Sequence, residues 1–293
     1  MNKILVVTGG AGFVGSNLIE FLLKKTKLKI YSIDNYSTGK KINHIKNKRV
    51  KYFKGETNNI FKILDKYKKN INAIFHFGEY ARIHQSFADI RKCFEFNISG
   101  SAEVFMFCLK NKIKLIYSAT SASLGNKGLD QELSPYAFSK AKNLNFLMNL
   151  KKWYNFSFEI LYFYNVYGKR QIKTGKMATV IGIFEQQYKM GKSLTVVKPG
   201  TQSRKFTHID DTVNGCYLAW KKNMNRHYTL SNSKSYTILE VAKLFTNKVR
   251  FLQKRLGERN KSTVVKNIGN TKLYKIPCRT SLKKYINEFK QNK

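Results

Sequence analysis

The sequence predicts an α/β fold, in which a doubly wound parallel sheet is joined to a smaller mixed α/β domain. Short apolar runs without alternation, as at residues 4–7, are typical of parallel strands that are buried on both faces. The chain has 293 residues, enough for one large domain and a smaller one, but only three prolines and no linker-like stretch. We therefore expect residues 1–168 to form the first domain and residues 169–293 the second, with some later segments returning to the first.

The first expected strand, at residues 3–8, runs directly into a turn that is rich in glycine. The glycines fit both G-x-G-x-x-G and the wider spacing of Gly9, Gly12 and Gly15, with Phe13 and Val14 inside the turn. Residues 16–25 then carry apolar side chains at helical spacing. A strand–turn–helix unit of this kind lets the backbone approach a pyrophosphate, and the helix supplies amide donors from its N-terminus. We expect a dinucleotide-binding (Rossmann) domain.

The second expected strand, at residues 29–33, ends at Asp34, roughly twenty residues beyond the glycines. An acidic side chain at this place accepts hydrogen bonds from the adenosine ribose hydroxyls. The alternative is that Asp34 merely caps a loop together with Asn35. We favour the ribose role and NAD as cofactor, while Lys40 and Lys41 leave NADP open because they could bind a 2′-phosphate.

The same stretch of chain resembles a known family. The glycine spacing, Asp34–Asn35, Gly55–Glu56, and the runs at residues 73–78 and 97–101 resemble the extended short-chain dehydrogenase/reductases, the NAD-dependent epimerase/dehydratase family. The resemblance implies that Glu56 lies near the adenine, that Phe77 and Gly78 pass close to the cofactor, and that Asn97 steadies the site. Residues 79–81, Glu-Tyr-Ala, depart from the family's common run.

A second motif carries the expected chemistry. Tyr136 and Lys140 lie four residues apart where a long helix is expected, so both side chains emerge on one face. A lysine ammonium beside a phenol, with the positive nicotinamide nearby, favours the phenolate and lowers the pKa of the tyrosine towards neutrality. Such spacing also occurs by chance in many helices. Behind a dinucleotide turn and inside the S-P-Y-x-x-S-K context of the family, we interpret the pair as catalytic. We also expect Lys140 to bind the cofactor through the nicotinamide ribose.

The partner hydroxyl precedes this helix. Counting back from Gly125 by the family's pattern indicates Thr120 as the catalytic Ser/Thr, with Ser118 and Ser121 as rivals. The resembling 4,6-dehydratases need an Asp-Glu pair directly after this position. Ser121 and Ala122 stand there instead. We therefore do not expect a dehydratase.

Three segments of the second half resemble the family's substrate site. Residues 159–171 match R-x-x-N-V-Y-G-P-R with two replacements, and the resemblance implies that Tyr164 lies on the nicotinamide side and that Asn165 contacts the substrate diphosphate or sugar. Residues 204–211 and 255–258 match two further motifs. Arg204 and Arg255 can fork onto phosphate oxygens, and Glu258 can accept from the nucleoside ribose. Without those motifs they would be interpreted as surface charges.

The composition narrows the choice of partner. A net charge of +38 could favour nucleic acid, a membrane surface or an acidic substrate. Lys is spread along the whole chain, and Lys, Asn, Ile, Tyr and Phe all have A/T-rich codons. We interpret the charge as codon drift on a solvated surface and expect no nucleic-acid partner.

Neither a metal nor a membrane is expected. The five histidines show no metal-ligand spacing, and the four cysteines are widely separated, which fits a reducing cytoplasm. No apolar run approaches the length that spans a membrane, and Gly9 and Gly10 interrupt the apolar start too early for a signal peptide. We expect a cytoplasmic protein that does not insert into membranes.

The predicted activity is NAD-dependent epimerisation of a nucleotide-activated sugar. The resemblance favours a UDP-hexose inverted at C4 through a 4-keto intermediate, in a homodimer. An alternative is an ADP-glycero-manno-heptose 6-epimerase, because residues 175–179 resemble its G-x-M-A-S segment, although Thr174 stands where that group has its second catalytic Lys. An alternative of another class is a catalytically idle family member that binds RNA.

Overall fold

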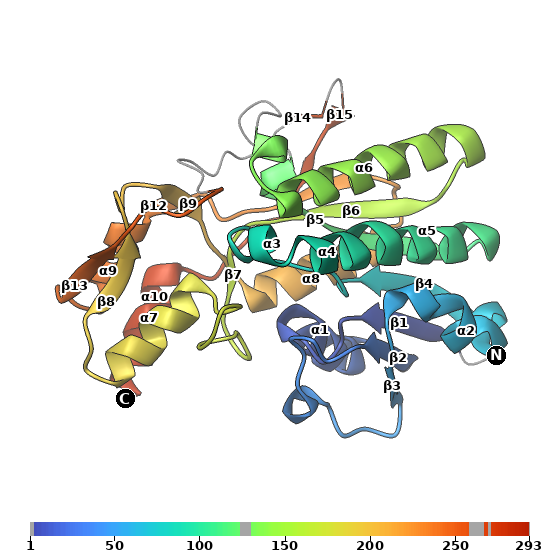
Figure 1. The fold of residues 1–293 in the computed structure, drawn as a ribbon. Helices are drawn as coiled ribbons and strands as arrows, with labels where there is room; N and C mark the ends of the chain where they lie inside the picture. Colours follow the sequence, from blue (N-terminus) through green and yellow to red (C-terminus); the bar gives the residue numbers. More distant parts are fainter. Residues whose placement is uncertain (1–2, 124–129, 258–266, 269–270, 293) are drawn as a thin grey trace.

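The central feature of the computed structural model is a wide parallel sheet (Figure 1). The structure describes residues 3–123, 130–257, 267–268 and 271–292. Within these ranges eight strands pair in the order β16-β11-β6-β5-β4-β1-β2-β3, and each neighbouring pair is parallel. Their bounds are β1 Ile4–Thr8, β2 Lys29–Asp34, β3 Val50–Lys54, β4 Ile71–His76, β5 Lys114–Thr120, β6 Phe158–Phe163, β11 His227–Leu230 and β16 Tyr274–Lys275. The predicted doubly wound parallel sheet is confirmed.

Two layers of helices cover the sheet, as β1 illustrates. Ile4 and Val6 pack into a core shared with α5 (Ser101–Lys110) and α6 (Pro135–Tyr154). Leu5 and Val7 pack into a second core, shared with α1 (Phe13–Lys25) and α8 (Ile209–Lys222). Both faces of the strand are therefore buried. This is why its sequence lacks the alternation of a half-exposed strand.

A smaller part lies beside the carboxyl ends of the strands (Figure 1). Its core contains Phe184, Phe206, Val241, Phe245 and Ile286. Its elements are β7 Val166–Tyr167, α7 Val180–Lys189, β8 Leu194–Val197, β9 Ser203–Lys205, β10 Thr207–His208, β12 Ser235–Thr237, α9 Ile238–Phe245, β13 Val249–Leu252 and α10 Leu282–Gln291. Between them α8, β11 and β16 belong to the large sheet and its helices. A boundary at residue 168 remains a prediction.

Short helical segments connect these layers. They include α2 Ile60–Leu64, α3 Gln85–Ala88, α4 Ile90–Phe94 and the π-helical turn Glu95–Gly100, while β14 Asn267–Ile268 and β15 Thr271–Lys272 form a separate pair. Among the described residues no helix is both long and apolar enough to cross a lipid bilayer. The clearest difference from the sequence prediction is that helix α1 begins at Phe13 rather than at residue 16, because Gly12, in an extended conformation, already serves as its N-cap. Strand β5 continues to Thr120 through its pairing with β6.

Candidate active site

A cavity of about 590 Å³ opens at the carboxyl ends of β1, β4 and β5, next to the point where the strand order reverses. Open α/β sheets bind their ligands at such a switch point. Most of the predicted site residues line it: Gly9, Gly12, Phe13, Val14, Gly15, Asp34, Asn35, Glu56, Phe77, Gly78, Thr120, Tyr136, Lys140, Asn165, Arg204 and Arg255. Glu258, like Gly125, lies outside the described residues. Asn97 and Tyr164 do not line the cavity.

Surrounding atoms leave no space for a side chain on Gly9 or Gly15, so the turn has only backbone beside the cavity and leaves room for a ligand. Gly9 has a φ of +70°, and a Cβ there would lie 2.9 Å from the carbonyl carbon of Phe77. A Cβ on Gly15 would lie 2.2 Å from the Gly9 carbonyl oxygen. At Gly12 the added atom would meet only that oxygen, at 3.1 Å. The start of α1 therefore faces the cavity with bare backbone, as a pyrophosphate requires.

Asp34 is the last residue of β2 and contacts the glycine turn. Its Oδ2 accepts from the amide of Ala11 at 2.9 Å, and its Oδ1 accepts from the amide of Tyr36 at 2.8 Å. Burial raises the pKa of Asp34, while these backbone donors act in the opposite direction. Each carboxylate oxygen has a second lone pair for a ribose hydroxyl. Lys40 and Lys41 are exposed and outside the cavity lining, so the residues present fit NAD.

Tyr136 is positioned by the start of α6. Ser134 caps this helix by accepting from the amide of Ala137 at 3.1 Å, and the amide of Tyr136 donates to Ser86 Oγ at 3.2 Å. Thr120, the last residue of β5, forms a side-chain hydrogen bond with Tyr136. Its rival Ser118 donates instead to the carbonyl of His76 at 3.0 Å. The geometry therefore favours Thr120 as the partner hydroxyl.

The electrostatics of Tyr136 differ from the sequence prediction. Burial raises the pKa of Tyr136 to about 12, and the charge of Glu79 adds to the rise. The hydrogen bond with Thr120 and the charge of Arg82 lower it. The pKa of Tyr136 thus lies above its ordinary value, whereas the sequence predicted that Lys140 and the nicotinamide together would bring it towards neutrality. The reason lies in the contacts of Lys140.

The hydrogen bonds of the Lys140 ammonium go to groups other than Tyr136. Its Nζ donates to Glu79 Oε2, to Tyr117 Oη at 3.2 Å and to the carbonyl of Ser118. An ammonium has three donors, so these contacts use all of them. Burial lowers the pKa of Lys140, and the Glu79 carboxylate opposes this effect. The lysine charge is thus balanced inside the protein before any ligand arrives.

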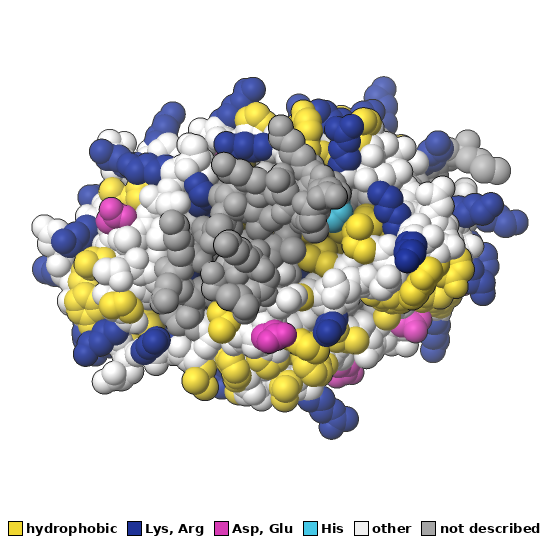
Figure 2. Space-filling model, turned by 90° about the horizontal axis from the view of Figure 1, so that it is seen from above, with side chains coloured by type: hydrophobic (Ala, Val, Ile, Leu, Met, Phe, Trp, Pro, Cys, Tyr) yellow, Lys and Arg dark blue, Asp and Glu magenta, His cyan; other side chains and the backbone are white. Residues whose placement is uncertain are grey.

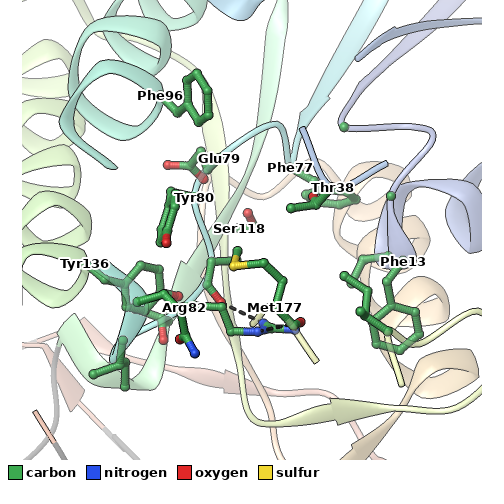
Figure 3. Close-up of a pocket in the computed structure, with 18 of the residues that line it drawn as sticks. Phe13, Thr38, Phe77, Glu79, Tyr80, Arg82, Phe96, Ser118, Tyr136 and Met177 are labelled. Carbon is green, nitrogen blue, oxygen red and sulfur yellow. Dashed lines mark hydrogen bonds between the residues drawn. The ribbon is translucent and has the colours of Figure 1, made fainter. Parts of the chain in front are cut away.

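The sequence prediction missed several charged residues that line the cavity, among them Asp89, Lys92 and the two described next. Glu79 and Arg82 both follow β4 and line the cavity. The Arg82 Nε donates to the carbonyl of Met177 at 2.9 Å, and Nη1 donates to that of Ala81 at 2.7 Å, which holds the guanidinium on the same side of the cavity as Tyr136 (Figure 3). The departure of residues 79–81 from the family's run was the one available signal.

Two predicted cofactor residues lie behind the cavity wall. Asn97 is buried, accepts from the amide of Tyr80 at 2.6 Å and donates to Ser139 Oγ at 3.0 Å, so it joins the loop after β4 to α6. Tyr164 is buried in the core, where its hydroxyl accepts from Thr229 at 3.4 Å. Phe163, the last residue of β6, lines the cavity in its place.

The second half of the chain reaches the same cavity. Arg204 comes from β9 and Arg255 from the segment after β13. Asn165 follows β6, and its Nδ2 donates to the carbonyl of Lys205 at 2.9 Å. The dinucleotide cradle, a tyrosine–threonine pair and two arginines thus share one cavity. Among the described residues no cluster of His, Cys, Asp and Glu could hold a metal ion.

Comparisons of the sequence and of the structure with known proteins both find epimerases. Residues 5–231 match the NAD dependent epimerase/dehydratase family. An ADP-L-glycero-D-manno-heptose-6-epimerase from Brachyspira hyodysenteriae is 28% identical over 257 residues, covering 82% of this chain and 79% of that protein. A UDP-N-acetylglucosamine 4-epimerase from Methanobrevibacter ruminantium has a TM-score of 0.83 at 26% identity, covering 99% and 96% of the two chains. A UDP-glucose 4-epimerase from Thermotoga maritima has a TM-score of 0.85 at 22% identity, covering 99% of each chain.

Proposed function

The chain belongs to the NAD dependent epimerase/dehydratase family, and from this premise we propose that it epimerises a nucleotide-activated sugar, a UDP-hexose, at C4. The observation that carries the proposal is that one cavity is lined by Tyr136 and Thr120 together with the dinucleotide cradle and the two arginines. The similarity to UDP-sugar 4-epimerases supports C4 as the reacting position.

The proposed roles follow from the positions of the side chains. NAD, when bound, supplies a hydride acceptor and donor for C4 of the sugar. Tyr136 Oη takes the proton of the C4 hydroxyl as the carbonyl forms and returns it when the carbonyl is reduced. Thr120 hydrogen-bonds to Tyr136 and steadies the reacting oxygen. Arg204 and Arg255 hold the diphosphate while the 4-keto sugar turns over and presents its other face.

The heptose 6-epimerase alternative has one observation in its favour and one against. The relative from Brachyspira hyodysenteriae favours it, and Met177, Ala178 and Thr179 of the resembling segment line the cavity. No lysine of that segment does. Lys173 pairs with Glu185 at 2.8 Å, and the exposed residues 174–176 lie outside the cavity lining. The segment that resembles that group therefore contributes no lysine to the described cavity lining, which counts against the alternative and supports C4.

A dehydratase finds equally little support in the site. Ser121 and Ala122 line the cavity directly after Thr120 and provide no carboxyl group for the elimination of water. Glu79 does bring a carboxylate, but Lys140 occupies it. The proposed reaction is therefore an isomerisation, in which the sugar neither gains nor loses atoms.

We also propose that the enzyme is a cytoplasmic homodimer. Apolar side chains on α4, α5 and α6 are exposed on the outer layer of helices: Ile90, Met106, Phe138 and Met148. Sedimentation should then give about twice the mass of 34.1 kDa. An RNA-binding role finds no support on the face that Figure 2 shows, where Lys and Arg side chains are spread rather than gathered in one patch.

One experiment tests the proposed reaction. The purified protein is incubated with UDP-glucose, UDP-N-acetylglucosamine, UDP-glucuronic acid and ADP-glycero-manno-heptose in turn, and the products are followed by NMR. We expect one UDP-sugar to equilibrate with its C4 epimer. Conversion of the heptose alone, at C6, would select the alternative. No conversion of any of them would contradict the proposal.

A further inference from the structure

We propose that Glu79 is a positioning residue, which holds the Lys140 ammonium against β5, balances its charge and thereby sets the pH range in which Tyr136 exchanges its proton. The inference rests on the proposed role of Tyr136 in epimerisation. Its test includes a measurement that needs no turnover.

A directed chain of hydrogen bonds ends on Glu79. Thr8 Oγ1 accepts from the amides of Phe77 and Gly78, each at 3.0 Å, so its own hydrogen points to His76 Nδ1 at 2.8 Å. The hydrogen of the neutral ring must then sit on Nε2, which donates to Ser101 Oγ at 2.9 Å. Burial lowers the pKa of His76 to about 4, in agreement with a neutral ring.

The same donor-to-acceptor order continues from Ser101 to the Glu79 carboxylate. Because Ser101 Oγ accepts from His76, its hydrogen goes to Glu79 Oε1 at 3.0 Å. Tyr117 Oη accepts from Asn143 Nδ2 at 3.1 Å and from Lys140, so its hydrogen also goes to Oε1, at 3.0 Å. Every neighbour therefore presents a donor, and only an ionised carboxyl accepts from all of them.

The pair of Glu79 and Lys140 is enclosed by protein. The two side chains are 3% and 5% exposed, and their contacts come from β5, α5 and α6. Buried charges remain in water-poor surroundings only when they are paired and hydrogen-bonded. This arrangement meets both conditions, and it fixes the Lys140 ammonium by contacts that do not include Tyr136.

The charges that face Tyr136 show why Glu79 matters for proton exchange. Arg82 and the bond with Thr120 favour the phenolate, whereas Glu79 and the Cys93 thiol disfavour it. Glu79 is the only one of the four that also neutralises Lys140. Removal of its charge should therefore ease the ionisation of Tyr136, and removal of Arg82 should hinder it.

The test compares Glu79→Gln with the opposite variant Arg82→Met. Glutamine keeps the volume of Glu79 and its acceptor oxygen but lacks the charge. The ring carbon that bears the hydroxyl of Tyr136 is followed by ¹³C NMR in NAD-loaded protein and assigned with Tyr136→Phe. We expect the Tyr136 titration in Glu79→Gln to move to lower pH by about one unit or more, and in Arg82→Met to higher pH.

Activity gives the second readout. The acid limb of the kcat/KM profile should move with the NMR titration. At pH values on the acid limb of the wild-type profile, kcat/KM of Glu79→Gln should therefore be about tenfold higher than that of wild type. Ser101→Ala removes one hydrogen bond to Glu79 but keeps the charge, and should move neither curve by more than about a third of the Glu79→Gln shift.

The outcomes separate the two proposals. A Tyr136 titration that is unchanged, or moves to higher pH, in Glu79→Gln would overturn the role of Glu79 whatever the substrate is. Absence of turnover with every nucleotide sugar would overturn the proposed function, while the NMR shift would still support Glu79. If Glu79→Gln fails to fold, Glu79→Gln/Lys140→Met removes both charges, and its titration must still lie below that of Lys140→Met.

Discussion

Replacement of Lys140 by methionine tests the buried ion pair through stability. Methionine has nearly the length and packing volume of lysine but no charge. The change leaves the Glu79 carboxylate buried without its counter-charge, and breaking a buried pair in this way costs about 3–5 kcal/mol. Since Ser101 and Tyr117 still donate to Glu79, we expect a loss near the lower end, about 3 kcal/mol in the free energy of unfolding.

A matched double variant separates charge from packing. Glu79→Gln/Lys140→Met has the same methionine but no carboxylate to leave unpaired, so it should be at least about 1 kcal/mol more stable than Lys140→Met. Urea unfolding at pH 7, followed by far-UV circular dichroism, gives both values if the slopes agree. A Lys140→Met protein within about 0.5 kcal/mol of wild type would refute the reasoning, because a change of that size is typical of the surface.

Two further predictions concern the ligands. In the proposed assignment Asp34 binds the ribose as a carboxylate, and burial raises its pKa, so NAD affinity should begin to fall at a pH above the ordinary 3.8. NAD should also bind more tightly than NADP in fluorescence titration at neutral pH; the reverse preference would contradict the assignment. Arg204→Ala and Arg255→Ala should each weaken nucleotide-sugar binding by about 1.5–3 kcal/mol and leave NAD affinity nearly unchanged, as measured by calorimetry; equal losses for both ligands would place the arginines elsewhere.

The parts of the site that could be predicted from sequence are local in the chain. The strand, the glycine turn, α1 and Asp34 follow one another within the first 34 residues, and their roles depend on spacing alone. The family, the parallel sheet and the enzymatic nature of the protein were predicted from such local patterns, and the family match and the strand order confirm them. The spacing of Tyr136 and Lys140 likewise indicated one helix, and α6 contains both.

The remaining features depend on contacts between distant segments. Glu79 meets Lys140 across 61 positions of the chain, and no pattern within either segment reveals the other. The pKa of Tyr136 depends on burial and on that carboxylate, so spacing from Lys140 gave the wrong direction. At the end of β6 the side chains alternate between cavity and core, which puts Phe163 in the wall and Tyr164 in the core.

The central claim is that Tyr136 moves the proton of the sugar hydroxyl, and Tyr136→Phe tests it most directly. Phenylalanine keeps the ring and removes only the hydroxyl, so the fold and NAD binding should persist, as circular dichroism and fluorescence titration would show. With the nucleotide sugar that the wild-type protein converts, turnover measured by NMR should fall by about 10²–10⁴-fold. Turnover within about threefold of wild type would contradict the mechanism, because a positioned general base contributes far more than that.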